Sequence, residues 1–108
     1  MLINFEQTFI ILGKPDPILK PNSKEPFLLL DAVIEALMSP EEGISGQEKA
    51  ERWKLATKIY FNPKTIDLTI EEVAKIKDLI GKGFPSPLVV GQAWQMLEGE
   101  RDGKKEKK

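Results

Sequence analysis

The fold is decided by residues 69–99, TIEEVAKIKDLIGKGFPSPLVVGQAWQMLEG, which contain two consecutive helix-start signals. Thr69 and Glu72 have the spacing of a capping box, in which each side chain accepts a hydrogen bond from the backbone N–H of the other residue. The apolar residues that follow recur every three or four positions, which predicts an amphipathic helix that ends near Lys82. Its buried stripe consists of Val73, Ile76, Leu79 and Ile80.

The second signal is Ser86 followed by Pro87, which is typical of an N-cap and a first helical residue that needs no N–H donor. A helix that begins here ends at Gly99, and Gly81 and Gly83 suit the C-terminal cap of the helix before it. A phosphate-loop interpretation of these two glycines and the lysine between them is disfavoured, because that motif follows a strand and places Ser or Thr after its lysine.

Two further helices are predicted upstream. Ser45 and Glu48 have the spacing of another capping box, and the helix that they open runs to about Tyr60. Pro26 suits the first turn of an earlier helix that runs to about Met38. Short loops between the helices predict a compact antiparallel bundle. Opposite charges four positions apart indicate solvated helix faces, and the pairs are Glu48 with Arg52, Glu71 with Lys75, and Asp78 with Lys82.

The first twenty residues show the alternation of a half-buried strand. Over residues 2–12 the apolar side chains fall mainly at odd positions, at Ile3, Phe5, Phe9 and Ile11. Gly13 and the prolines after it predict a turn, and residues 18–20 predict a short return strand. A lone hairpin is marginal in water, so its apolar face is expected to lie on helices. The predicted fold is therefore α+β, an N-terminal β-hairpin packed on a small bundle of about four helices.

Length and composition narrow the function. The 108 residues predict one globular domain over 1–98 and a disordered charged tail over 99–108. Lys and Arg total 16 and Asp and Glu total 17, and this balance excludes the broad basic surface of a dedicated DNA-binding domain. The absence of cysteine and histidine excludes disulfides, the common zinc sites and catalysis by imidazole or thiolate. No stretch predicts a membrane span or a signal peptide, so a cytoplasmic location is expected.

The polar residues predict no catalytic centre, no cofactor site and no metal site. Asp67, Glu71 and Glu72 lie close together, but the helix dipole and the capping box explain their position. The ordered oxygen-ligand loop of a calcium site is missing. The serines occupy cap and turn positions, and the chain has no histidine to activate them. We therefore expect a protein that is not an enzyme and needs no cofactor.

The aromatic residues favour a different class of function. The helix predicted over 87–98 is apolar on more than one face, as expected of a helix that is central or covered by a partner. Tryptophan and tyrosine are favoured at protein interfaces because they combine large apolar area with a polar group. The alternative is that both tryptophans fill the core. The residues predicted to line a partner surface are Trp53, Tyr60, Phe84, Val90 and Trp94.

Three segments between residues 45 and 98 carry a resemblance to a known group of proteins. They are Arg52-Trp53-Lys54-Leu55-Ala56, Asp67-Leu68-Thr69 and Pro87-Leu88-Val89-Val90-Gly91-Gln92-Ala93-Trp94. In these segments the chain resembles a family of small uncharacterised proteins from tailed bacteriophages and prophages. The resemblance implies a phage accessory, assembly or host-interaction role in the cytoplasm of the host cell, and it transfers no active-site residue.

Three hypotheses follow. The leading one is a non-enzymatic protein-interaction module, with a protein partner or self-association. The alternative is weak nucleic-acid binding through the lysine-rich tail and the helix over 69–82, and it is disfavoured because the helix over 87–98 carries no cation. The third is a small enzyme that uses carboxylates or a lysine, for which no signature is present. No membrane association is expected.

Overall fold

The structure is a computed structural model, and it describes residues 1–14 and 16–99 of the chain. It combines a small helical bundle with one short antiparallel sheet, which confirms the predicted α+β class. The helices in the described part are α1 (Leu29–Met38), α2 (Gly46–Tyr60), α3 (Ile70–Gly83) and α4 (Pro87–Leu97). The strands are β1 (Leu2–Ile3) and β2 (Ile66–Asp67). No helix of the described residues is long and apolar enough to cross a membrane.

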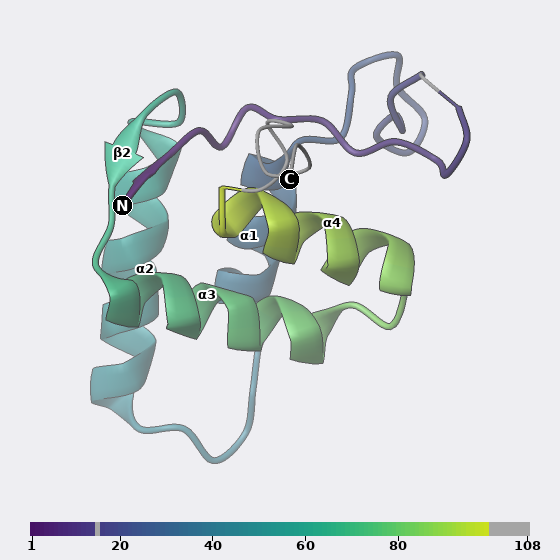
Figure 1. Ribbon diagram of the computed structural model, residues 1–108. Helices are drawn as coiled ribbons and strands as arrows, with labels where there is room; N and C mark the ends of the chain where they lie inside the picture. The colour runs from purple at the N-terminus through teal and green to yellow at the C-terminus, as the bar shows by residue number, and fades with distance from the viewer. Residues whose placement is uncertain (15, 100–108) are drawn as a thin grey trace.

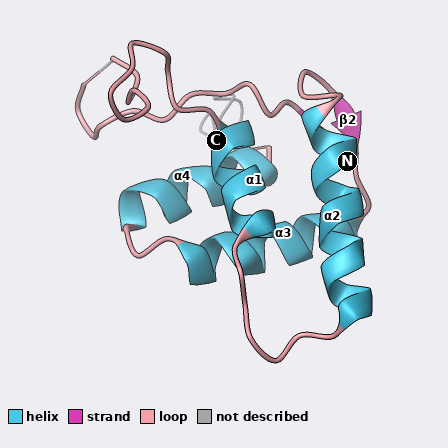
Figure 2. Ribbon diagram, turned by 180° about the vertical axis from the view of Figure 1, so that it is seen from behind, coloured by secondary structure: helices cyan, strands magenta, loops and turns pink. Residues whose placement is uncertain are grey.

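The helices form two antiparallel pairs that lie across each other. Figures 1 and 2 show α1 beside α2, and α3 with α4 running across this pair. Helix α1 packs against each of the other three helices and is therefore the centre of the bundle. The buried face of α1 consists of Leu29, Ala32, Val33, Ala36 and Leu37. The short loops predicted antiparallel neighbours correctly, whereas the crossing of the two pairs was not predicted.

The N-terminal segment differs from the long strand predicted over 2–12. Only β1 is regular strand, and it pairs antiparallel with β2, which lies between α2 and α3. Pairing of the segment with its own return consists of isolated bridges. In one of them Ile10 lies opposite Pro17, and nearby the Ile18 N–H donates to the Phe9 carbonyl at 2.8 Å. The hairpin pairing is thus present, but the two arms do not form a continuous ladder.

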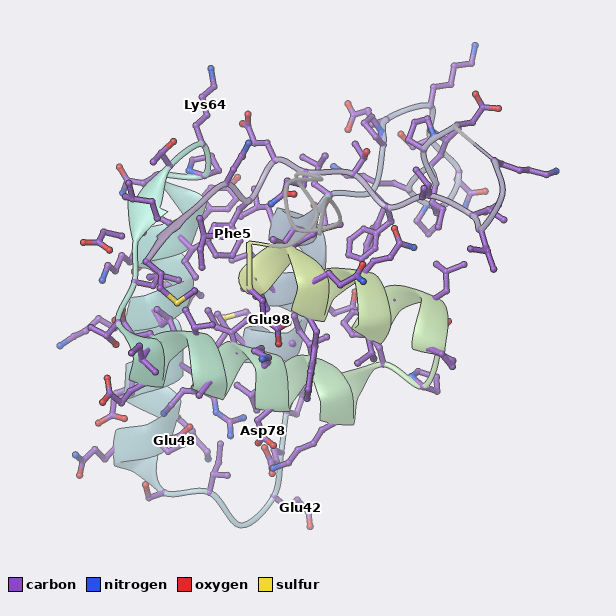
Figure 3. The ribbon with its side chains drawn as sticks, viewed as in Figure 1. Phe5, Glu42, Glu48, Lys64, Asp78 and Glu98 are labelled. Carbon is purple, nitrogen blue, oxygen red and sulfur yellow. The ribbon has the colours of Figure 1, made fainter. Side chains whose placement is uncertain are left out.

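The backbone of this segment serves the start of α1 instead. The carbonyls of Gln7 and Phe5 accept hydrogen bonds of 2.8 Å from the N–H groups of Leu29 and Leu30. The first N–H groups of a helix have no partner within the helix, so these bonds satisfy donors that burial would otherwise leave unpaired. Phe5 and Phe9 are fully buried and fix the segment to the helices, as Figure 3 shows for Phe5. Because the carbonyls of Phe5 and Gln7 bond to α1, they are not available for pairing with a second strand, and the regular strand ends before residue 5.

One predicted helix start is wrong, and so is the cap role predicted for Gly81 and Gly83. Helix α1 begins at Leu29, not at Pro26, because Pro26 bridges to Leu19 in extended conformation. Helix α3 continues through Gly83, and neither Gly81 nor Gly83 has a positive φ. A Cβ atom at position 81 would lie 3.8 Å from the indole ring of Trp94, so the glycine faces α4 instead of ending the helix.

Candidate interaction surface

An uncharged hollow of about 320 Å³ lies between α1 and α2. The α2 residues that line it lie three, four and seven positions apart, which places them on one face of the helix. The α1 residues that line it are four positions apart for the same reason. The lining residues are Ile34, Met38, Trp53, Ala56, Thr57, Tyr60 and Phe61. Among the lining residues Ala56 belongs to the hydrophobic core and Ile34 packs against it, so the hollow lies at the edge of the core.

Four large apolar side chains rise around this hollow, and we call Met38, Trp53, Tyr60 and Phe61 the aromatic face. Their exposed fractions are 42%, 60%, 57% and 74%, respectively. The rings of Tyr60 and Phe61 pack edge to face with their centroids 5.2 Å apart. Single exposed apolar residues are ordinary, but a contiguous group marks an interaction site or a ligand-binding groove.

A second hollow of about 360 Å³ adjoins the first and shares Ile34 and Tyr60 with it. Charged residues of both signs line this end, among them Lys20, Asp31 and Glu35. The ammonium of Lys20 lies 3.6 Å from a carboxylate oxygen of Asp31, and this charge raises the pKa of the lysine above its ordinary value. The aromatic face thus continues into a polar rim along α1.

The structure separates the predicted partner residues into two groups. Trp53 and Tyr60 lie together on the aromatic face. Phe84 and Val90 are half-buried and pack against the hydrophobic core, so they contribute little open surface. Trp94 lies with them on the α3–α4 side of the molecule. The five residues do not form one surface.

Two contacts with Lys77 of α3 hold the side chain of Trp94 in place. Its exposed fraction is 39%, and its indole N–H donates to the Lys77 carbonyl at 3.1 Å. The ammonium of Lys77 lies 4.6 Å from the ring centroid, within cation–π range. The polar group and one face of the indole therefore already have intramolecular partners.

The N-terminal segment covers part of α4 through Gln92. The side-chain oxygen of Gln92 accepts from the Ile10 N–H at 3.0 Å, and its amide nitrogen donates to the Ile10 carbonyl at 2.7 Å. This two-point contact fastens the backbone of the segment against the helix. The apolar character of α4 therefore has an explanation within the chain: three of its residues are buried, and others pack against the core.

Sequence reasoning missed two members of the aromatic face. Met38 stands four positions after Ile34, and this spacing could have indicated a second apolar stripe on α1 beside the core stripe. Phe61 directly follows Tyr60 at the C-cap of α2, one position beyond the helical periodicity from which the buried stripe is predicted. Both signals depend on knowing which side of each helix is buried.

The neighbouring, core-facing side of α2 carries an ion network around Arg52. This residue is 7% exposed, and its guanidinium binds Glu48 at 2.8 Å and Glu41 at 2.9 Å. Lys75 of α3 binds Glu48 at 2.9 Å. Hydrogen bonds from Arg52 and Lys75 lower the pKa of Glu48, and the bond to Glu48 raises the pKa of Arg52. Figure 3 labels Glu48 beside α2 and α3.

This network corrects three expectations about the charged residues. The expected capping box at Ser45 is half present: the hydroxyl accepts from the Glu48 N–H at 3.0 Å, but the Glu48 carboxylate binds Arg52 and Lys75. The expected Glu71–Lys75 pair is replaced by contacts from Lys75 to α2. The Glu48–Arg52 pair forms as expected but is partly buried, not solvated.

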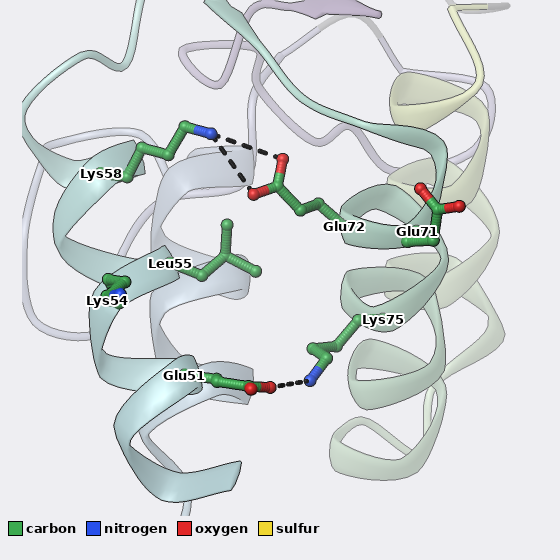
Figure 4. Close-up of a pocket in the computed structure, with 7 residues that line it drawn as sticks. All are labelled: Glu51, Lys54, Leu55, Lys58, Glu71, Glu72 and Lys75. Atoms are coloured by element: carbon green, nitrogen blue, oxygen red, sulfur yellow. Dashed lines mark hydrogen bonds and ion pairs between the residues drawn. The ribbon is translucent and has the colours of Figure 1, made fainter. Parts of the chain in front are cut away.

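The hollow between α2 and α3, about 330 Å³, is lined mainly by charged residues, unlike the hollow at the aromatic face. Figure 4 shows Lys58 and Glu72 in contact across it, and Lys75 in contact with Glu51. Three lysines and three glutamates line it, with Leu55 between them. These contacts join α2 to α3. No group of three acidic residues among the described residues is arranged to hold a metal ion.

Comparison of the chain with protein-family models, with curated proteins and with solved structures gives no match. The candidate site therefore rests on the geometry of the molecule itself. The lysine-rich part of the predicted tail, residues 104–108, lies outside the described residues.

Proposed function

We propose that this protein is a non-enzymatic protein-interaction module that binds through the aromatic face between α1 and α2. One observation carries the proposal: three aromatic rings, each more than half exposed, surround a hollow lined by no charged side chain. Such a surface fits a protein partner whose apolar side chains fill the hollow. It does not fit an anionic lipid headgroup or a phosphate backbone, because both require cations in contact with the ligand.

The charges on α3 also favour a protein partner over nucleic acid. Lys75 binds Glu48 and Glu51, Lys77 pairs with Glu98, and Lys82 pairs with Asp78. A lysine that contacts phosphate must first give up such a carboxylate. Within the described residues, α3 is therefore a poor phosphate-binding helix, and we do not propose nucleic-acid binding.

Site-directed photocrosslinking in the cell that carries the gene tests the proposed function. A photoreactive phenylalanine analogue replaces Tyr60 in one variant and Gln47, an exposed residue away from the aromatic face, in a control. We expect a protein adduct from position 60 alone, and we expect Trp53→Gln in the same chain to abolish it. Equal adducts from both positions, or none from either, would contradict the proposal.

The accessory role in a phage or prophage rests on the sequence resemblance alone. It predicts that genes for phage structural, assembly or host-takeover proteins flank the gene. A neighbourhood of unrelated metabolic genes in several genomes would remove this part of the proposal and leave the interaction surface standing.

A further inference from the structure

We infer that the occupant of the aromatic face is a second copy of this chain, packed in an antiparallel two-fold arrangement of the α2 helices. This inference rests on the proposed function, because it names the partner of the same surface. Three features support it: the apolar area, the shape of the surface and the charge of the chain.

The apolar area matches what one side of a stable dimer needs. A fully accessible aromatic side chain offers about 150–250 Å², so the three rings at 57–74% exposure present on the order of 400 Å². A standard interface covers about 800 Å² per partner, of which roughly 450–520 Å² is apolar. The exposed part of Met38 contributes toward the remainder, and the charged hollow beside Ile34 supplies a polar rim.

The shape of the surface is complementary to itself. A two-fold interface uses the same patch on both subunits, so the patch must hold both the projecting groups and the space that receives them. Here Phe61 and Trp53 project, and the hollow of about 320 Å³ with Ile34 and Ala56 in its lining lies between them. Each copy can therefore pack its projecting rings against the rings that border the hollow of the other.

The order of side chains along α2 fixes the expected register. Trp53 stands at one end of the face and Phe61 at the other, a separation of about 12 Å along a helix at 1.5 Å per residue. Thr57 lies midway and is small, and its neighbour Ala56 is buried in the core, so no large side chain of this face separates two α2 helices at this point. With the two-fold axis at this point, Trp53 of each copy meets Phe61 of the other.

Charge does not oppose the association. The net charge of the chain is −1, so two copies repel each other only weakly. The hollow itself adds no charged side chain that the interface would desolvate. The polar rim contains Lys20 together with Asp31 and Glu35, so both signs are available at the edge.

Sedimentation velocity and light scattering of the full chain, from about 1 µM to about 1 mM, test the inference. We expect the mass to rise from 12.2 kDa to twice that value with concentration. Trp53→Gln and Phe61→Ser should each weaken the dimer at least tenfold. Leu12→Gln is the matched control, because Leu12 is 92% exposed and lies outside the aromatic face, and it should change nothing. Far-ultraviolet circular dichroism checks that each variant is folded.

Disulfide trapping tests the register, since the chain has no cysteine of its own. A Thr57→Cys variant lies at the expected axis and should form a disulfide-linked dimer on mild oxidation. A Gln47→Cys variant, exposed on another face of α2, should stay monomeric. The inference fails if the wild type is a monomer at every concentration, or if the dimer tolerates both aromatic substitutions.

Failure of this inference is distinct from failure of the proposed function. A monomer whose Tyr60 position still crosslinks to a different protein would overturn self-association and keep the interaction module. A dimer that assembles elsewhere, together with an unreactive Tyr60 position, would overturn both.

Discussion

Arg52 and Trp53 are neighbours in α2, and their environments are the reverse of the usual ones. The charged residue is 7% exposed and held by two carboxylates, whereas the large aromatic residue is 60% exposed. Arginine is almost never buried unless paired, and an exposed group of aromatic rings is equally uncommon on a monomer. The comparison predicts that the Arg52 side of α2 stabilises the fold, and the exposed Trp53 side is the one that we propose for binding.

Replacing Arg52 gives the largest expected effect. Arg52→Ala leaves Glu41 and Glu48 without their main partner, and removal of one member of a buried pair costs about 3–5 kcal/mol. Both glutamates are partly exposed, so we expect a loss of about 2–3 kcal/mol in the free energy of unfolding, measured by urea denaturation. Arg52→Lys keeps one charge contact, so its free energy of unfolding should lie between those of Arg52→Ala and the wild type. A loss below about 0.5 kcal/mol in Arg52→Ala would show that this side of α2 does not stabilise the fold.

The second tryptophan extends the comparison. The indole of Trp94 donates a hydrogen bond to the Lys77 carbonyl, whereas most of the Trp53 side chain lies in solvent. Trp94→Ala should cost about 2 kcal/mol, since it removes a half-buried ring and the hydrogen bond to Lys77. Trp94→Phe keeps a ring but loses the N–H donor and should cost about 1 kcal/mol. Equal stability of Trp94→Ala and the wild type in urea would show that Trp94, like Trp53, contributes little to the stability of the fold.

Acid should weaken the contacts that Glu48 makes with Arg52 and Lys75 and so lower the stability of the fold. Arg52 and Lys75 lower the folded-state pKa of Glu48, so its contribution to stability is present above the unfolded pKa of about 4.3. That contribution is lost as the pH falls from there through the lower folded-state value. Melting temperatures between pH 7 and pH 3 should therefore fall less steeply in Glu48→Gln than in the wild type. Identical slopes would show that this carboxylate is not linked to folding.

Trp53→Ala gives the smallest expected effect on the fold. Most of its ring lies in solvent, so the free energy of unfolding should change by less than about 0.5 kcal/mol. The measurement needs low micromolar protein, because any dimer adds a concentration-dependent term to apparent stability. A loss as large as that of Trp94→Ala would mean that the aromatic face is part of the structural core.

Local signals in the sequence predicted the helices well. Ser45, Thr69 and Ser86 each accept a hydrogen bond from a backbone N–H two or three residues ahead, as their positions indicate. These contacts depend only on neighbouring residues, so the sequence alone suffices to place them. The α+β class also followed from the sequence, whereas the periodicity left open whether Trp53 lies in the core or at the surface.

Long-range contacts could not be predicted in the same way. The pairing of β1 with β2 joins residues more than sixty positions apart, and the Gln92 contact with Ile10 spans 82. The apolar character of the α4 region led to the prediction that Phe84, Val90 and Trp94 line a partner surface. It could not show that other parts of the chain already pack against these residues. Met38 and Phe61 were missed for the converse reason, since their exposure depends on how α1 and α2 pack.

The contact between Gln92 and Ile10 also has a consequence for the order of folding. Ile10 is synthesised early, but Gln92, whose side chain binds the backbone N–H and carbonyl of Ile10, is added much later. Helix pairs close quickly because their contacts are local, whereas the part of the N-terminal segment around Ile10 must wait for a partner far along the chain. Until the ribosome has released α4, Phe5 and Phe9 lack part of the structure that holds their segment in place. A nascent chain stalled before residue 92 should therefore contain α1 to α3 and a loose stretch around Ile10, and hydrogen exchange of the whole chain should show this stretch opening before the helices do.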